Sequence, residues 1–318
     1  MRKLIYAFLL LILFPGSGRS TAIVVHDYLD REVKLEQPAE RIIGLAPHIV
    51  ENIFSAGAGD KIVAVVSYSN YPPAALQLPR IGSYHTVNYE AIVAANPDLV
   101  IMWQSGNGMK VLQTLQKLDL NVYVNEPRQL EDIARSINDI GMLAGTTHIS
   151  NKHATAHLQK LTRLKKQYSD ATPVSVLYQV WNDPLQTINH EHLISDVIRL
   201  CGGRNAFADA IALAPKINIE SVLKRDPDVI IASGMNEQRP DWLDDWKKWN
   251  TLSAVKRNHL YFVPPDLIQR HTLRILEGAQ IMCEQINSVR EARKKQTHRI
   301  LESFAHRGIT ARDMRPID

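Results

Sequence analysis

Two stretches of the chain carry the same pattern of apolar and polar residues, 130 positions apart. Residues 90–101 read "EAIVAANPDLVI", and residues 220–231 read "ESVLKRDPDVII". Each has a short apolar helical turn, then Pro-Asp, then a continuous run of apolar, largely β-branched residues. The residue before a proline disfavours helix, and a strand buried on both faces needs no polar alternation. The pattern therefore predicts, twice, a helix followed by a buried strand of a parallel sheet.

A second repeated pattern places a glycine-closed helix near the start of each half. Residues 51–59 read "ENIFSAGAG" and residues 196–203 read "DVIRLCGG", and glycine is favoured where a helix ends. Helices and strands that alternate in this way indicate a parallel sheet covered by helices. We therefore predict an α/β fold with two Rossmann-like lobes, each built on a parallel-type central sheet, at about residues 40–145 and 173–285.

The segment between the lobes predicts one long, rigid α-helix. It has no Gly/Ser-rich stretch that would act as a flexible linker, and we expect only small lobe motion when a ligand binds. Its apolar positions recur at steps of three and four residues, at Ala154, His157, Leu158, Leu161, Leu164 and Tyr168. The predicted organisation is a signal peptide (1–20), an N-terminal lobe with a leading β-hairpin (21–148), the bridging helix (149–170), a C-terminal lobe (171–288) and a basic helical or disordered tail (289–318).

The first residues have the composition of a secretory signal peptide. Arg2 and Lys3 precede an apolar run from Leu4 to Phe14 that is too short to span a bilayer as a helix, and small residues follow a Pro-Gly break. Loss of this segment removes three basic residues and no acid, so the net charge falls from +4 to +1. We therefore expect an exported, soluble protein, and we also expect a monomer. A nucleic-acid-binding protein would normally show a basic patch together with a binding motif, and the sequence shows no such combination. We therefore expect no nucleic acid partner.

The chain has two cysteines, Cys201 and Cys283. In an exported protein an isolated pair indicates a disulfide, with two buried free thiols as the alternative. The two cysteines are 82 residues apart. A bond that closes a loop of this length would stabilise the folded protein by roughly 4 kcal/mol, because it lowers the conformational entropy of the unfolded chain. It would tie the last helix to the second lobe.

Aromatic and polar residues follow the predicted strands of both lobes. Ligands of open parallel sheets bind beyond the carboxyl ends of the strands. Aromatic residues gathered at that end predict a cleft for a flat ligand, with local packing as the alternative for each residue taken alone. The residues that follow strands are Pro47, His48, Tyr68, Tyr71, Tyr84, His85, Trp103, Trp181, Asp266, Arg270 and His271.

Several of these segments resemble one family. The stretches "VSYSNYPP", "NYEAIVAANPDLVIMWQSGN", "LCGGRNAF" and "PPDLIQRHTLRILEGAQIMCEQI" are similar to the periplasmic cobalamin-binding proteins (BtuF-like) of ABC importers, within the helical-backbone (class III) substrate-binding proteins. The similarity covers nearly all of residues 40–288. It implies a protein that captures a corrinoid in the cleft between its lobes and delivers it to an ABC importer. It also implies that the corrinoid is transported cargo and that the protein has no prosthetic group.

The resemblance also assigns residues to the ligand. Tyr68, Tyr84, Trp103, Asp266 and Arg270 fall at matching positions. Tyr71, His85 and Trp181 join them as further candidates from the same loops, and His85 is a candidate for an axial contact to the metal of the ligand. Tyr84 stands where the family often has tryptophan, and Ala214, Leu267 and Ile268 stand where it has aromatic residues.

The repeated glutamates gain a function from the same resemblance. Family members dock on their transporter through one surface acid per lobe, and Glu90 and Glu220 occupy these positions. Their equivalence in the two halves suits a partner with twofold symmetry. The alternative is that both are ordinary acids of a helix N-terminus, favoured by the helix dipole.

Other functions stay open at this point. A haem or iron-siderophore receptor on the same scaffold could use His48 or His85. A zinc or manganese receptor would need His48, His85, Asp266 and His271 to converge. We expect His153, His157 and the segment 190–192 to be solvated. We predict no enzyme, because the sequence has no Gly-x-Ser-x-Gly elbow, phosphate loop or dinucleotide fingerprint.

Overall fold

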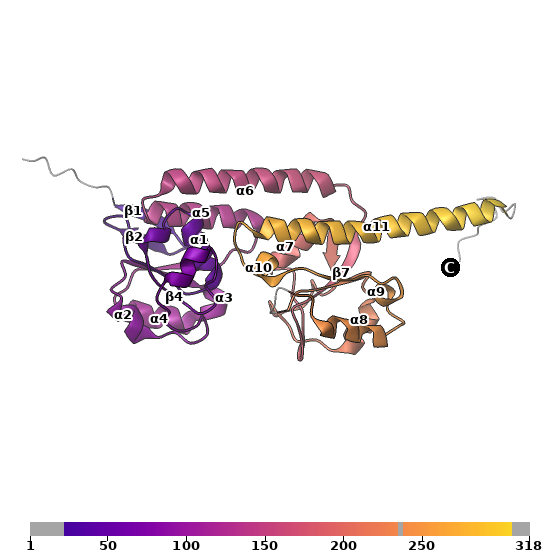
Figure 1. The fold of residues 1–318 in the computed structure, drawn as a ribbon, viewed down its shortest axis with the longest axis horizontal. Helices are drawn as coiled ribbons and strands as arrows, with labels where there is room; N and C mark the ends of the chain where they lie inside the picture. Colours follow the sequence, from indigo (N-terminus) through magenta and orange to yellow (C-terminus); the bar gives the residue numbers. More distant parts are fainter. Residues whose placement is uncertain (1–21, 235–237, 307–318) are drawn as a thin grey trace, which may run out of the picture.

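The protein folds into two α/β lobes that lie side by side beneath long helices (Figure 1). The structure is a computed structural model and describes residues 22–234 and 238–306. The predicted signal peptide (1–20) and the last part of the predicted tail (307–318) lie outside the described residues. A β-hairpin of β1 (Ile23–His26) and β2 (Glu32–Leu35) precedes the first lobe, as the sequence predicts.

The first lobe has a four-stranded parallel sheet with the strand order β4-β3-β5-β6. Strand β5 pairs with β3 through Val100 and Ile43, among others. The strands are β3 (Ile42–Gly44), β4 (Ile62–Val65), β5 (Leu99–Trp103) and β6 (Val122–Asn125), and the helices are α1 (Pro47–Ser55), α2 (Tyr89–Ala94), α3 (Gln104–Asn107), α4 (Met109–Lys117) and α5 (Leu130–Leu143), with 3-10 turns at Gly59–Lys61 and Pro73–Gln77.

The second lobe repeats this topology with the strand order β10-β7-β11-β12, again all parallel. If the four strands of each sheet are numbered along the chain, both sheets have the strand order 2-1-3-4. The predicted fold class is therefore confirmed. The elements are β7 (Val174–Gln179), β8 (Trp181–Asn182), β9 (Leu185–Gln186), α7 (Leu193–Leu200), β10 (Gly203–Asn205), α8 (Ile219–Arg225), β11 (Val229–Ala232), a 3-10 helix (Asp241–Lys248), α9 (Ser253–Lys256), β12 (Leu260–Phe262), α10 (Pro265–Ile268) and α11 (Ile275–His306).

Each sheet is buried on both faces, which explains the continuous apolar runs. In β5, Leu99 and Ile101 belong to one hydrophobic cluster, whereas Val100 and Met102 belong to another on the opposite face. A strand covered by helices on both sides has no position where a polar residue would reach solvent.

The lobes are joined by helix α6 (Thr147–Tyr168), which begins two residues before the predicted bridging helix. Its buried stripe includes Ala154, Leu161 and Tyr168, and Leu158 is exposed instead of buried. One hydrophobic cluster runs from α1 and α5 through α6 into α7 and α11, so the lobes share a core along this side. Helix α11 continues without a break through residue 288, where the sequence predicts the boundary between the C-terminal lobe and the tail.

The predicted solvation of the histidines is wrong for His157. Its side chain is buried, and Nε2 lies 2.9 Å from the Leu130 carbonyl oxygen. Burial lowers the pKa of His157. The residue therefore joins α6 to α5.

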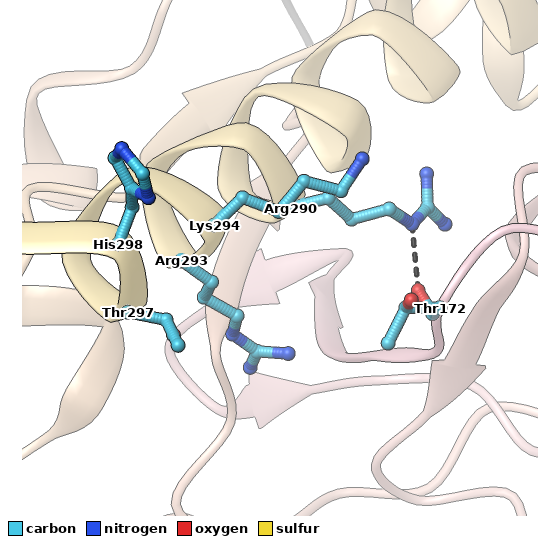
Figure 2. Close-up of a pocket in the computed structure, with 6 residues that line it drawn as sticks. All are labelled: Thr172, Arg290, Arg293, Lys294, Thr297 and His298. Carbon is cyan, nitrogen blue, oxygen red and sulfur yellow. Dashed lines mark hydrogen bonds between the residues drawn. The ribbon is translucent and has the colours of Figure 1, made fainter. Parts of the chain in front are cut away.

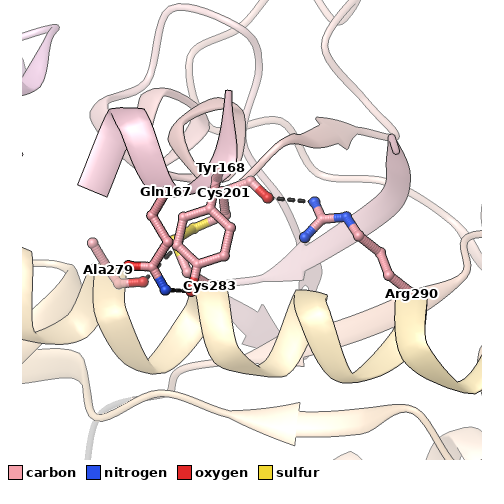
Figure 3. The surroundings of a disulfide bond; sticks show 6 residues. All are labelled: Gln167, Tyr168, Cys201, Ala279, Cys283 and Arg290. Atoms are coloured by element: carbon pink, nitrogen blue, oxygen red, sulfur yellow. Dashed lines mark hydrogen bonds between the residues drawn. A yellow bond between two sulfur atoms is a disulfide. The ribbon is translucent and has the colours of Figure 1, made fainter. Parts of the chain in front are cut away.

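Cys201 and Cys283 form a disulfide, which confirms the prediction and removes the alternative of two free thiols. Both cysteines are fully buried, and the bond links the end of α7 to the first third of α11 (Figure 3). Arg290 reinforces this link, because its guanidinium donates a hydrogen bond to the Cys201 carbonyl oxygen. The second lobe and the last helix are thus joined covalently.

Candidate ligand-binding cleft

A cleft of about 680 Å³ lies between the carboxyl ends of the first-lobe strands and the start of α10. It follows the expectation for parallel sheets, because residues at or shortly after the carboxyl ends of β3, β4 and β5 (Pro47, Tyr68 and Trp103) line it. The side chains that line it are Pro47, His48, Tyr68, Asn70, Tyr84, Trp103, Pro265, Asp266, Gln269 and Arg270.

The first lobe supplies an aromatic wall. Trp103 ends β5, and its ring centroid lies 5.9 Å from that of Tyr84. The indole Nε1 of Trp103 is buried and has no hydrogen-bond partner among the described residues. Tyr68 is 76% exposed, so an aromatic face stands free at the mouth of the cleft. Broad π surfaces of this kind suit a flat, partly apolar ligand.

The loop that presents Tyr68 is held in place by its neighbours. Tyr68 has φ 65°, in the left-handed region that side chains other than glycine rarely adopt. Ser69 is fully buried, and Arg80 donates to its carbonyl oxygen at 3.2 Å. A residue held in such a backbone conformation is common at binding sites, where the surrounding structure sets the side-chain direction.

The second lobe contributes charge. Arg270 pairs with Asp266 at 3.0 Å, and its Nη2 donates to Asn70 Oδ1 across the cleft at 2.7 Å. Arg270 Nη1 is buried and has no hydrogen-bond partner among the described residues. Donors and a carboxylate therefore face the aromatic wall, and they suit a ligand with amide or phosphate side groups.

An ion pair beneath the cleft joins the two lobes. Glu51 of α1 is 1% exposed, and both its oxygens accept hydrogen bonds from Arg274 at 2.7 Å. Arg274 also lies 3.8 Å from the centre of the Tyr71 ring, a cation–π contact. A paired, hydrogen-bonded carboxylate of this kind is costly to disrupt. The pair fixes how the second lobe meets α1.

Two buried histidines, His48 and His271, and the half-buried His192 lie between the lobes. The His48 ring is 5.3 Å from that of His271, and His271 is 6.0 Å from His192. Burial lowers the pKa of His48 to about 3 and of His192 to about 4, and it lowers the pKa of His271 well below its ordinary value. All three are therefore neutral near pH 7. The expectation that residues 190–192 are solvated is wrong for His192, whose Nδ1 accepts a hydrogen bond from the Ile194 N–H.

The structure brings together five of the eight predicted ligand residues, namely Tyr68, Tyr84, Trp103, Asp266 and Arg270. The other three lie elsewhere. Tyr71 packs on Arg274, and Trp181 contacts Trp242. His85 is exposed, and its ring contacts that of Tyr84 at a tilt of 39°, with centroids 3.7 Å apart.

Two further polar lining residues, Asn70 and Gln269, were not predicted from the sequence. Each lies within two residues of a predicted ligand residue, so a prediction that covered the whole of each loop would have included both.

The convergence of His48, His85, Asp266 and His271 that a zinc or manganese receptor would need is not observed among the described residues. Within residues 22–234 and 238–306, no group of three or more His, Cys, Asp or Glu side chains is placed to hold a metal ion. Over the same part of the chain, no helix is both long and apolar enough to cross a membrane.

A second cavity, of about 380 Å³, lies under α11 away from the cleft (Figure 2). Arg290 donates from Nε to the Thr172 carbonyl oxygen at 2.6 Å and also bonds the carbonyl oxygen of Cys201, the residue that closes α7. A cation is favoured at a helix C-terminus, so Arg290 has a structural role here. Arg293 beside it pairs with Asp228.

Comparison with known proteins gives consistent matches. Residues 42–267 match the family described as periplasmic binding protein. A vitamin B12-binding protein of Vibrio cholerae is 37% identical over 247 residues, which are 77% of this chain and 88% of the relative. The vitamin B12-binding protein of Vibrio parahaemolyticus is 36% identical over 260 residues, 81% of this chain and 93% of the relative.

Solved structures agree with these matches. The periplasmic vitamin B12 binding protein BtuF of Vibrio cholerae superposes with a TM-score of 0.74 at 35% identity, over 80% of this chain and 98% of that one. The heme-binding protein RhuT from Roseiflexus has a TM-score of 0.68 at 20% identity, over 79% of this chain and 99% of that one, and shares the fold alone.

Proposed function

The chain belongs to the periplasmic binding protein family, and from this membership we propose that it captures a cobalamin or related corrinoid between its lobes and delivers it to an ABC importer. One observation carries the proposal. An aromatic wall and a charged wall face each other across the cleft. The chain is also 35% identical to a vitamin B12 binding protein of the same fold.

The ligand-binding set that we propose is Tyr68, Tyr84 and Trp103 on one side and Asp266 and Arg270 on the other, with Asn70 and Gln269 added. The corrinoid is the cargo and not a prosthetic group, and the protein acts as a binding protein without a reaction of its own. Its place is the periplasm. Both walls of the cleft come from one chain, so the proposed working form is a monomer.

The first test is retention of the ligand. Purified protein is mixed with cyanocobalamin and passed through gel filtration, and the visible absorbance of the vitamin should elute with the protein. Haem and an iron-siderophore are run in parallel. Co-elution of either one in place of cyanocobalamin would overturn the corrinoid assignment.

Replacing Trp103 with alanine is expected to weaken cyanocobalamin binding by about 2 kcal/mol, or roughly 30-fold, because a half-buried aromatic wall residue contributes at about this scale. Calorimetry measures the change. Trp249→Ala is the matched control, since Trp249 is 38% exposed and lies outside the cleft lining. Equal affinities for the two variants would remove Trp103 from the site.

Docking on the importer is proposed to use Glu90 and Glu220. The two residues occupy equivalent places, in the first turn of α2 and of α8, and each helix begins at an asparagine whose side chain accepts an N–H of that turn (Asn88 and Asn218). Both acids are exposed, and neither has an ion pair with a described residue. Helices α2 and α8 lie on the side of the molecule opposite α6 (Figure 1). One flat partner could therefore meet both.

The double variant Glu90→Ala, Glu220→Ala is expected to bind cyanocobalamin within about twofold of the wild type and to lower its uptake at least about tenfold, since loss of a charge pair at an interface costs more than 1.4 kcal/mol. Uptake is measured in proteoliposomes that contain the importer. Glu291→Ala, which removes an exposed acid of α11, is the control. Unchanged uptake by the double variant would contradict the docking proposal and leave ligand capture intact.

A further inference from the structure

His48, in the wall of the cleft, has a ring nitrogen without a hydrogen-bond partner among the described residues. The residue follows β3 at the start of α1, lines the cleft and is 5% exposed. Its Nε2 is buried without a hydrogen-bond partner, and neither ring nitrogen bonds a described residue. An unpaired buried polar atom costs about 1–3 kcal/mol, so a native structure that keeps one calls for an explanation.

The ring is held by packing and not by hydrogen bonds. It meets Trp103 edge-on with centroids 5.0 Å apart and an interplanar angle of 90°, and His271 lies behind it. His48 is therefore positioned by the same aromatic wall that would contact a flat ligand. A ligand that lies against Trp103 comes close to this imidazole.

The imidazole of His48 is in the neutral form that can donate a lone pair to a metal. Burial first, and then the positive charge of Arg270, lower the pKa of His48 to about 3. The ring is therefore neutral near pH 7 and keeps one nitrogen lone pair, which is the form that binds metals.

The remaining described histidines of this region are less suited. His85 is exposed, lies outside the cleft lining and contacts the Tyr84 ring at a tilt. His271 and His192 lie outside the lining as well, and His192 Nδ1 already accepts a backbone N–H. His48 is the single histidine among the described residues that line the cleft.

The chemical class of the partner follows from the surroundings. One imidazole cannot hold a free metal ion, and no group of three metal-binding side chains is present among the described residues. One imidazole does complete the coordination of a metal whose equatorial positions are already filled by a macrocycle. Such a metal has axial positions, and a weakly held water in one of them can be exchanged.

We propose that His48 distinguishes between forms of the cargo by coordinating the metal of a macrocycle whose axial position carries water. This inference rests on the proposed function and deepens it. For aquocobalamin, the lone pair of one His48 nitrogen forms a bond to Co(III), the Co–O bond breaks, and water leaves with its electron pair. The other nitrogen keeps its proton, and the oxidation state of cobalt does not change. Cyanide holds the same position in cyanocobalamin, so that form binds without this bond.

The test compares two cobalamins on the wild type and on His48→Gln. The visible spectrum of bound aquocobalamin should shift toward that of aquocobalamin mixed with free imidazole, and the shift should be lost in His48→Gln. The wild type should prefer aquocobalamin over cyanocobalamin at least about tenfold, a ratio that falls close to one in His48→Gln. His85→Gln is the contrasting variant and should keep the spectral shift.

The outcomes separate this inference from the proposed function. Wild type that binds cyanocobalamin but leaves the aquocobalamin spectrum unchanged would overturn the role of His48 alone, and this measurement does not depend on the folding of a variant. Wild type that binds neither a corrinoid nor haem would overturn both. A haem absorption change that depends on His48, in a protein that binds no corrinoid, would overturn the proposed function and retain the coordination inference for the other macrocycle.

Discussion

Replacing Glu51 with alanine should lower the free energy of unfolding by about 3–5 kcal/mol, because it leaves the partly buried charges of two arginines without their shared partner. Glu51 is 1% exposed, is bonded through both oxygens to Arg274 and lies 3.7 Å from Arg270. The loss is larger than for a surface pair, since solvent cannot screen or replace the contact fully. The same change removes the partner that holds Arg274, on which Tyr71 packs, and a nearby charge of the cleft residue Arg270.

Urea unfolding followed by circular dichroism measures the effect. Glu291→Ala is the control, because Glu291 forms an exposed pair with Lys294 and should change the stability by no more than about 0.5 kcal/mol. The double variant Glu51→Ala, Arg274→Ala should recover part of the loss, since it no longer leaves the Arg274 charge unpaired. A loss below about 1 kcal/mol for Glu51→Ala would show that the pair does not hold the lobes together.

Removing the disulfide should lower the free energy of unfolding by about 4 kcal/mol, because the bond closes a loop of 82 residues in the unfolded chain. Cys201 and Cys283 are fully buried, so alanine at both positions keeps the site apolar. The effect arises mainly in the unfolded state, where the free chain gains conformational entropy. The cleft residues do not contact this bond, so ligand affinity should change far less than stability.

Urea unfolding of Cys201→Ala, Cys283→Ala is compared with that of the oxidised wild type. Wild type unfolded in the presence of a strong reductant provides the second measurement, and it should show a loss of similar size. A difference below about 1 kcal/mol in both experiments would mean that the unfolded chain stays compact without the bond.

The fold was predictable because its signals are local. The two Pro-Asp segments mark helix ends and strands that are read from a dozen residues each, and their equivalence becomes the shared strand order of the two sheets. The bridging helix follows from the spacing of residues such as Leu161 and Tyr168. The exposure of Leu158 was not predictable in this way, because it depends on how closely α5 covers α6.

The candidate site was predictable only in part. Rules for parallel sheets gather residues that follow strands, and Tyr68, Trp103 and Arg270 do meet in one cleft. The same rule cannot say which way a side chain points within a loop. Tyr71 turns to Arg274 and Trp181 to Trp242, because these partners come from distant parts of the chain.

The buried groups between the lobes could not be assigned from sequence. Glu51 is one polar residue on a helix, and nothing local reveals that Arg274 approaches it from the other lobe. His48 appeared in the sequence as one of several histidines near strand ends. Its burial, its unpaired nitrogen and its contact with Trp103 come from tertiary packing.

Calorimetric titration of the purified protein with cyanocobalamin tests the central claim most directly. We expect one binding site per chain and a submicromolar Kd, which corresponds to a binding free energy more favourable than about −8 kcal/mol. Absence of measurable heat, together with absence of co-elution, would contradict capture of a corrinoid in this cleft.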